Sequence, residues 1–349
     1  MSRLLFVTGT PGSVRGGSGT FIGISVLREA LLGLGHRVDL VTSPAASPGT
    51  LSRLLFNLRR RRAAVHAHYD AVVGFDLDGV FVSAPGARRV ASIKGVIAEE
   101  LQFERGVTRL SMRLAAYFEG CNVRRADRVI ATSLYAADRI VERYRVARER
   151  VQVVPEPIDL ARWNAALDRA PRRAPGEPAI LCVAHLYPRK QVGSLLRALT
   201  LLKSPARLRV VGTGPEGGDL VALARELRLG DRVALLEHVP FDRLVEEYRN
   251  AELFCLPSLQ EGFGIVFVEA MAAGLPIVAC RAAAVPEVVP DGECGMLVPP
   301  RDEPALALAL ERLLGDEGEK KRLGAAGRQR AARYDAPLVA RQFLEAIGL

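Results

Sequence analysis

The sequence is poor in cysteine, and the spacing of its cysteines fits neither a disulfide framework nor a metal site. The five cysteines stand far apart and include no Cys-x-x-Cys pair. This argues against a disulfide framework and against a zinc site, and it fits a reducing cytosol. Long apolar runs are missing too, because the most apolar stretch, Gly262 to Cys280, is interrupted by Glu269. We therefore expect no membrane span, and the apolar run Leu4–Val7 is too short for a signal peptide.

The remaining composition is that of an ordinary globular protein. Its 349 residues are 49% hydrophobic and 25% charged, which suits two domains of average size. The net charge of +9 lies in residues 1–170, which hold 25 Lys and Arg against 16 Asp and Glu, while residues 171–349 hold 23 of each. The first half therefore suits an anionic partner. No nucleic-acid motif is present, so we expect no nucleic acid and consider a membrane surface instead.

Residues 51–62 have the pattern of an amphipathic helix that ends in four arginines. Leu51, Leu54, Leu55 and Leu58 share one helical face. Such a helix is typical of proteins that bind to an anionic membrane surface. The same pattern also fits a surface helix that buries its leucines in the core and leaves its arginines in solvent, and the sequence leaves both interpretations open.

Strands and helices alternate in both halves, which predicts an α/β protein with two doubly wound, Rossmann-like domains. The proline-rich and glycine-rich residues 161–178 are predicted to be the linker between them. Ligands of such folds bind beyond the carboxyl ends of the strands. The expected strands are 3–8, 37–42, 71–75, 90–93, 128–131, 151–154, 179–184, 208–211, 233–236, 253–256 and 276–279. The expected helices are 20–32, 51–62, 192–202, 220–227, 241–249 and 264–273, followed by a helical region over 303–349 that is interrupted near 335–337.

A glycine-rich loop, residues 9–19, follows the first strand. Its glycines do not match the Gly-x-Gly-x-x-Gly fingerprint, and Asp39 lies inside the second strand instead of at its end, so NAD binding is not expected. The loop can still offer backbone N–H groups to an anion or to sugar hydroxyls. A plain surface loop is the alternative.

The strongest pattern covers residues 258–279. Glu261 precedes Gly262-Phe263-Gly264, and Glu269 stands eight residues later in an otherwise apolar helix. A carboxylate buried there needs a hydrogen-bonding partner, because leaving it unpaired costs several kcal/mol. The two hydroxyls of a ribose would serve, and a structural glutamate bonded to backbone is the alternative.

This segment resembles the nucleotide-sugar signature of glycosyltransferase family 4, whose members are retaining enzymes of the GT-B fold. Segments 183–190, 211–215 and 286–299, and Gly16-Gly17 in the first loop, are similar to other parts of the same family. The resemblance implies two Rossmann-like domains that face each other across a cleft. The implied domains are an acceptor-binding domain over 1–170, a nucleotide-sugar-binding domain over 171–334, and a C-terminal helix over 335–349 that packs back on the first domain.

The resemblance also implies a role for individual residues. Glu269 would hold the ribose of the donor, and Glu261 would hold the donor sugar and phosphate. Lys190 and Arg189 would neutralise the leaving diphosphate in place of a metal ion, so no cofactor is expected. The other expected donor-binding residues are Gly262, Phe263, Gly264, Gly212, Gly214 and His185, and those on the acceptor or phosphate side are Gly16, Gly17, Lys94 and Asp76.

Three positions depart from the family pattern. His185 stands where arginine is usual, Lys94 where the first domain often supplies a histidine, and Glu156-Pro157 where Asn-Gly is often found. Asp76-Leu77-Asp78 has the spacing of a metal-binding pair. It lies in the wrong domain for that role, so an acceptor contact or a capping role is expected instead.

The predicted function is a metal-independent, retaining hexosyltransferase. Its donor would be a nucleoside diphosphate sugar and its acceptor a hydroxyl of a glycan, a lipid-linked sugar or a small molecule. We expect it in the cytoplasm, peripheral to the inner membrane face. Two alternatives remain: a sugar-nucleotide epimerase or phosphorylase of the same fold, and a non-catalytic partner protein that binds a sugar nucleotide.

Overall fold

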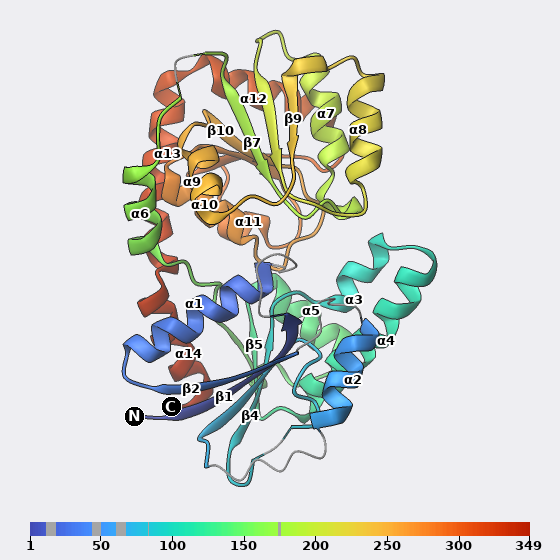
Figure 1. Ribbon diagram of the computed structural model, residues 1–349, viewed down its shortest axis with the longest axis vertical. Helices are drawn as coiled ribbons and strands as arrows, with labels where there is room; N and C mark the ends of the chain where they lie inside the picture. The colour runs from blue at the N-terminus through green and yellow to red at the C-terminus, as the bar shows by residue number, and fades with distance from the viewer. Residues whose placement is uncertain (12–18, 44–49, 61–67, 83, 174–175) are drawn as a thin grey trace. The chain divides into compact units, whose positions relative to one another are not determined.

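The computed structural model describes residues 1–11, 19–43, 50–60, 68–82, 84–173 and 176–349 (Figure 1). The chain folds into two units. Unit 1 is Met1–Ile158 together with Tyr334–Leu349, and unit 2 is Asp159–Arg333. Each unit contains one six-stranded sheet whose neighbouring strands are all parallel. The two sheets with their helices confirm two Rossmann-like domains.

The sheet of unit 1 has the strand order β2-β1-β3-β4-β5-β6. From β1 the chain passes to β2 on one side and then to β3 on the other, so the topological switch lies between β1 and β3. The core side chains of these strands are apolar, with Phe6 and Phe75 packed edge to face at 5.1 Å between ring centroids. The strands are β1 (Arg3–Pro11), β2 (Arg37–Ser43), β3 (Ala71–Phe75), β4 (Arg88–Ile93), β5 (Arg128–Ala131) and β6 (Val151–Val153).

The last helix of the chain belongs to unit 1. Helix α14 lies beside α1, and its Phe343 packs against Phe6 of β1 at 6.2 Å between ring centroids (Figure 1). Asp335 begins this helix by accepting a hydrogen bond from the N–H of Ala336. The helices of unit 1 are α1 (Gly19–Gly33), α2 (Thr50–Arg60), α3 (Ile97–Glu100), α4 (Gly106–Arg125), α5 (Leu134–Tyr144) and α14 (Ala336–Ile347).

The sheet of unit 2 has the order β12-β11-β10-β7-β8-β9. The chain moves from β7 outward to β8 and β9 and then returns to β10 on the other side of β7, which puts the switch between β7 and β10. The strands are β7 (Ala179–Val183), β8 (Arg207–Val211), β9 (Val233–Leu236), β10 (Leu253–Leu256), β11 (Ile277–Cys280) and β12 (Gly295–Val298). The helices are α6 (Leu160–Arg169), α7 (Val192–Leu201), α8 (Gly217–Glu226), α9 (Phe241–Arg249), α10 (Ile265–Ala273), α11 (Val285–Val288), α12 (Glu303–Gly315) and α13 (Glu317–Ala331).

The predicted linker over 161–178 is wrong in its first half, because residues 160–169 form helix α6. Trp163, Ala166 and Leu167 are buried at helical spacing, and Asp159 caps the helix by accepting from the N–H of Arg162. Trp163 packs edge to face against Tyr248 of α9, at 5.4 Å between ring centroids. The helix therefore belongs to unit 2, and the division of the chain lies at Ile158, before the expected 170.

Candidate functional site

Three loops of unit 2 leave the sheet at one edge and carry the predicted donor residues. They follow β7, β8 and β10, which are neighbours in the middle of the sheet. Because parallel strands end at the same edge, residues 184–191, 212–216 and 257–264 lie together there. The 3-10 helix η4 (Pro188–Lys190) ends the first of these loops, and α10 begins at the end of the third.

Lys190 and Glu261 form a close ion pair in this region. The Lys190 Nζ lies 2.6 Å from Oε1 and 2.7 Å from Oε2 of Glu261, and both side chains are largely buried. Lys190 follows β7 and Glu261 follows β10, so the pair spans the topological switch of unit 2. Two residues predicted from separate motifs are thus brought together at the position where doubly wound sheets bind ligands.

Arg189 and His185 lie on the same loop as Lys190. The Arg189 guanidinium lies 5.1 Å from the centroid of the Tyr187 ring, and the Arg189 carbonyl accepts a hydrogen bond from the N–H of Leu259 at 2.8 Å. That backbone bond joins the loop after β7 to the loop after β10. His185 is exposed, with its ring 6.2 Å from that of Tyr187.

Gly212 and Gly214 let the loop after β8 pack directly against the loop after β7. A Cβ on Gly212 would lie 1.9 Å from the Ala184 carbonyl oxygen, and one on Gly214 would lie 2.5 Å from the Leu186 nitrogen. Gly212 also has a φ of 141°, which side chains disfavour. The structure thus gives both glycines a packing role in this edge, and their predicted contact with the donor stays a prediction.

Helix α10 begins among the predicted residues. Gly264 is its N-cap residue, has a φ of 89°, and gives the helix no side-chain cap. The first N–H groups of such a helix attract anions. Phe263 is buried next to Gly262, so the backbone of residues 262–264 is held at the start of the helix.

Glu269 is buried on α10 and receives a hydrogen bond from Tyr248. The Tyr248 Oη donates to Glu269 Oε2 at 2.8 Å. Burial raises the pKa of Glu269 to about 7, and the bond from Tyr248 acts in the opposite direction. Within the described part of the chain, Oε1 has no hydrogen-bond partner. One oxygen is therefore held while the other is left to accept from a ligand.

Tyr248 was not predicted from the sequence. A glutamate in an apolar helix indicates that some donor must reach it, but Tyr248 lies 21 residues away on another helix. In the sequence the tyrosine is one of several apolar positions of α9, where it looks like an ordinary core residue.

In unit 1, Asp76 and Asp78 lie just after β3, next to the switch between β1 and β3. Asp78 accepts from the N–H of Gly9 at 2.6 Å and pairs with Arg53 of α2. Asp76 accepts from the N–H of Lys94 at 2.8 Å, and burial raises the pKa of Asp76 to about 6. These carboxylates join the ends of β1, β3 and β4 to α2. Within the described residues, no group of three or more His, Cys, Asp or Glu side chains is placed to hold a metal ion.

Two family profiles match the chain. The profile described as glycosyl transferases group 1 matches residues 165–330, and the profile described as glycosyltransferase family 4 matches residues 17–162. The chain belongs to glycosyltransferase family 4. The two matches follow the two units closely, so both Rossmann-like domains carry the family's sequence pattern.

Curated relatives of this family 4 protein include two named glycosyltransferases. The D-inositol 3-phosphate glycosyltransferase of Nocardia farcinica is 37% identical over 235 residues, which cover 63% of this chain and 52% of that protein. The MMP alpha-(1->4)-mannosyltransferase of Mycolicibacterium hassiacum is 37% identical over 212 residues, covering 60% of this chain and 50% of that protein. The chain thus spans about half the length of the curated relatives it matches.

Solved structures of similar fold cover the whole chain. Sucrose-phosphate synthase from Thermosynechococcus elongatus has a TM-score of 0.80 and 24% identity, and the likeness covers 99% of this chain and 98% of that one. Anabaena HepE in complex with UDP-glucose has a TM-score of 0.75 and 20% identity, with all of both chains covered. These likenesses confirm the GT-B fold.

Two of the departures from the family pattern lie against each other. Lys94, at the position where the family often has histidine, has its Nζ 2.9 Å from Oε1 of Glu156, at the position of the usual Asn-Gly. Both side chains are less than one tenth exposed. Gly23 of α1 makes room for the pair, since a Cβ there would lie 2.3 Å from Glu156 Oε2. The two departures therefore form one compensated ion pair. Gly16 and Gly17, also predicted for this side, lie outside the described residues.

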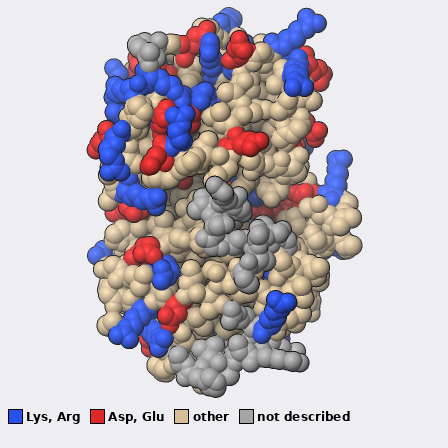
Figure 2. All heavy atoms as spheres, in the orientation of Figure 1, with Lys and Arg blue, Asp and Glu red and all other residues tan. Residues whose placement is uncertain are grey.

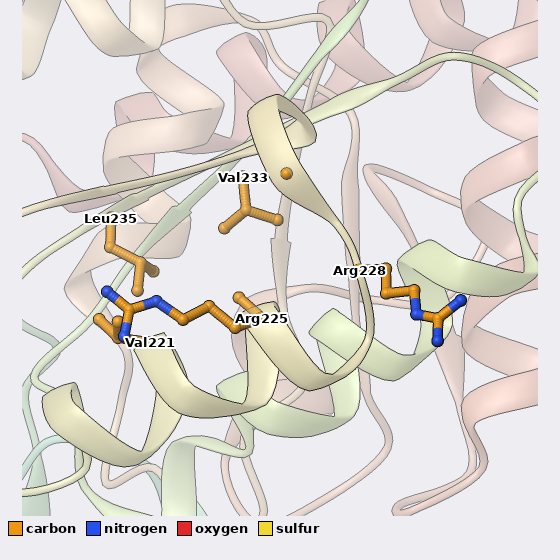
Figure 3. Close-up of a pocket in the computed structure, with 7 residues that line it drawn as sticks. Val221, Arg225, Arg228, Val233 and Leu235 are labelled. Carbon is orange, nitrogen blue, oxygen red and sulfur yellow. The ribbon is translucent and has the colours of Figure 1, made fainter.

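A separate cavity of about 510 Å³ lies between α8 and the edge strand β9. Figure 3 shows Arg225 extended beside Val221 and Leu235, while Arg228 points away from Val233. This cavity is lined by none of the predicted donor residues, and we assign no ligand to it.

Proposed function

We propose that this family 4 protein is a retaining, metal-independent glycosyltransferase that moves a hexose from a nucleoside diphosphate sugar to an acceptor hydroxyl. The observation that carries the proposal is the Lys190–Glu261 pair at the switch point of unit 2. The donor side is assigned to unit 2, and the family resemblance assigns the acceptor side to unit 1.

Lys190 is suited to receive the leaving diphosphate. Its ammonium group has three protons, and the two oxygens of Glu261 take two of them, which leaves one for a phosphate oxygen. Glu261 thereby orients the lysine but also cancels its charge. The start of α10 adds positive potential, and Arg189, on the same loop as Lys190, is the second cation that we assign to the diphosphate. Cations aimed at charge that develops as the glycosidic bond breaks lower the barrier without a metal ion.

Glu269 is suited to bind the ribose of the donor. Its Oε1 is available while Oε2 is held by Tyr248, and a carboxylate can accept from two neighbouring hydroxyls. A structural neighbour is consistent with such a donor, since the structure of Anabaena HepE contains UDP-glucose. The retained configuration would follow from attack on the face of the leaving group, with the departing phosphate accepting the proton of the acceptor hydroxyl.

A test of this proposal measures turnover and stereochemistry. The protein is incubated with UDP-, GDP- and ADP-sugars and a panel of glycan, lipid-linked and small-molecule acceptors, with and without EDTA. We expect one donor to release its nucleoside diphosphate only when an acceptor is present, unaffected by EDTA, and to give a product with the donor's anomeric configuration by NMR. Conversion of a donor without any acceptor would favour an epimerase, and conversion with phosphate alone would favour a phosphorylase. Binding of a donor without turnover would favour a non-catalytic partner protein.

We also propose that unit 1 contacts an anionic membrane surface through α2 and α4. None of the described helices has the length and apolar character to cross a bilayer. The leucines predicted to share one face of α2 differ in their burial. Leu54 is buried against Leu77 and against Ala115 of α4, so the core interpretation holds for that residue. The rest of the face is exposed together with a row on α4. These exposed side chains are Leu51, Leu55, Leu58, Val107, Leu110, Leu114 and Tyr117.

Charge favours an anionic lipid surface as the partner of these two rows. Their exposed fractions run from 46% at Leu55 to 84% at Val107, and neither α2 nor the first thirteen residues of α4 contain an acidic residue. Exposed arginines lie beside both rows, at positions 59, 105, 109 and 113. In Figure 2 the surface over α4, at the right, is largely uncharged with a basic side chain beside it. Apolar rows bordered by arginine are typical of interfacial helices.

Vesicle co-sedimentation tests the membrane proposal. We expect the protein to sediment with vesicles of phosphatidylglycerol and phosphatidylcholine at low salt but not with phosphatidylcholine alone. Binding should be lost in Leu110→Ser/Leu114→Ser and kept in Leu201→Ser, which changes an exposed leucine of unit 2. Equal sedimentation of both variants, or none of the wild type, contradicts the proposal.

A further inference from the structure

Tyr248 is a fully buried tyrosine whose hydroxyl reaches the carboxylate proposed to hold the donor ribose. It projects from α9, and its Oη lies 2.8 Å from Glu269 Oε2 and 3.4 Å from the Val266 carbonyl oxygen. The shorter bond is the stronger, because a charged acceptor roughly doubles the strength of a hydrogen bond. A hydroxyl placed inside a core needs such a partner.

The ring of Tyr248 is fixed on several sides by other aromatic rings. It stacks on Phe254 of β10 with centroids 5.9 Å apart and planes 15° apart. Trp163 of α6 meets it edge to face at 5.4 Å. Phe267 of α10 in turn packs edge to face on Phe254 at 5.9 Å. A ring enclosed in this way cannot swing, so its hydroxyl stays at one point in the unit.

We propose that Tyr248 is a positioning residue for donor binding: it fixes Glu269 through Oε2 and presents Oε1 to the hydroxyls of the nucleotide ribose. The inference rests on the proposed function, since it needs Glu269 to contact the donor. Tyr248 itself does not touch the donor. Its effect comes from the direction and the charge of the Glu269 carboxylate.

The charge of Glu269 depends on the same bond. Burial raises the pKa of this carboxyl to about 7, and the Tyr248 hydrogen bond lowers it against that effect. Without the phenol the carboxyl stays protonated to higher pH and accepts hydrogen bonds less strongly. The other titratable group acting on Tyr248 is Cys182 of β7, which burial keeps neutral by raising its pKa to about 12. Arg328 of α13 lies at Gly274, at the far end of α10.

The chain offers a matched control for the variant Tyr248→Phe. Tyr144 of α5 is also a buried tyrosine that donates to a buried carboxylate, that of Glu119 on α4, but it lies in unit 1. Tyr144→Phe therefore removes the same kind of bond at a place with no proposed donor contact. Trp163 is the only tryptophan of the chain and touches Tyr248, so its fluorescence reports whether the aromatic packing survives the substitution.

The experiment is calorimetric titration of wild type, Tyr248→Phe and Tyr144→Phe with UDP, GDP and ADP between pH 7 and pH 9. For the nucleotide that binds wild type, we expect Tyr248→Phe to weaken binding about tenfold at pH 7, the loss of one charge-assisted bond. This ratio should shrink toward pH 9, where Glu269 ionises in both proteins. Tyr144→Phe should bind like wild type, and the Trp163 emission of Tyr248→Phe should be unchanged.

The outcomes separate the two proposals. The positioning role is overturned if Tyr248→Phe binds the nucleotide as tightly as wild type. It is also overturned if the ratio of the two dissociation constants does not change with pH. Both results leave the proposed function standing. Equal weakening by Tyr144→Phe overturns the positioning role as well. A wild type that binds none of the three nucleotides contradicts the proposed function, and the positioning role with it.

Discussion

Glu269 should make unit 2 less stable as the pH rises, and Glu269→Gln should remove that dependence. The pKa of Glu269 is about 7 in the folded protein against an ordinary 4.5, because the side chain is buried. The stabilisation from the protonated form is complete below pH 4.5 and is lost as the pH rises through 7. A difference of one pKa unit corresponds to about 1.4 kcal/mol, so the whole loss is about 3 kcal/mol.

Glutamine has nearly the same shape, does not titrate, and can still accept from Tyr248. We therefore expect the free energy of unfolding of Glu269→Gln, relative to wild type, to rise by about 3 kcal/mol between pH 4.5 and pH 8. Urea denaturation followed by Trp163 fluorescence measures it, because this tryptophan lies in unit 2. Glu226→Gln, at an exposed position of α8, is the control. A difference between Glu269→Gln and wild type that is the same at both pH values would refute the reasoning.

Substitutions at three other contacts give further tests. Lys190→Ala should lower kcat by about 10²–10³ with the best donor, since it removes a cation beside the leaving group, and Lys190→Arg should retain part of the rate. Glu156→Gln should destabilise unit 1 by about 3–5 kcal/mol in denaturant titration, because the buried Lys94 ammonium loses the charge of its ion-pair partner, and adding Lys94→Met should restore stability. Gly214→Ala should lower stability by about 1–3 kcal/mol through its clash with backbone, whereas Gly218→Ala, with open space around it, should not.

The parts of the fold that depend on local pattern were predictable from the sequence. Strands 71–75, 128–131 and 233–236 and helix 241–249 have the predicted bounds, because runs of apolar residues and helical spacing are local signals. Helix α6 was missed because arginines and prolines around Trp163 obscured a short apolar face. Strand β12, a buried strand of only four residues, was also missed.

The residues of the candidate site that lie within local sequence motifs were predictable, but the contacts between them were not. Lys190 and Glu261 were both selected from local segments, and the structure joins them across 71 residues. The Lys94–Glu156 pair and the Tyr248–Glu269 bond were not predicted as contacts, because the sequence shows which groups need a partner and not which distant residue supplies it. Sheet order supplies that information, since it decides which strand ends are neighbours.

The central claim is that unit 2 binds a nucleoside diphosphate through Glu269. The most direct measurement is thermal unfolding of wild type and Glu269→Ala with UDP, GDP and ADP. At a hundred times its dissociation constant a ligand adds about 2.7 kcal/mol of stability. We predict a rise in Tm of wild type with one of the three nucleotides and its loss in Glu269→Ala. No rise with any nucleotide, or the same rise in Glu269→Ala, would contradict the account.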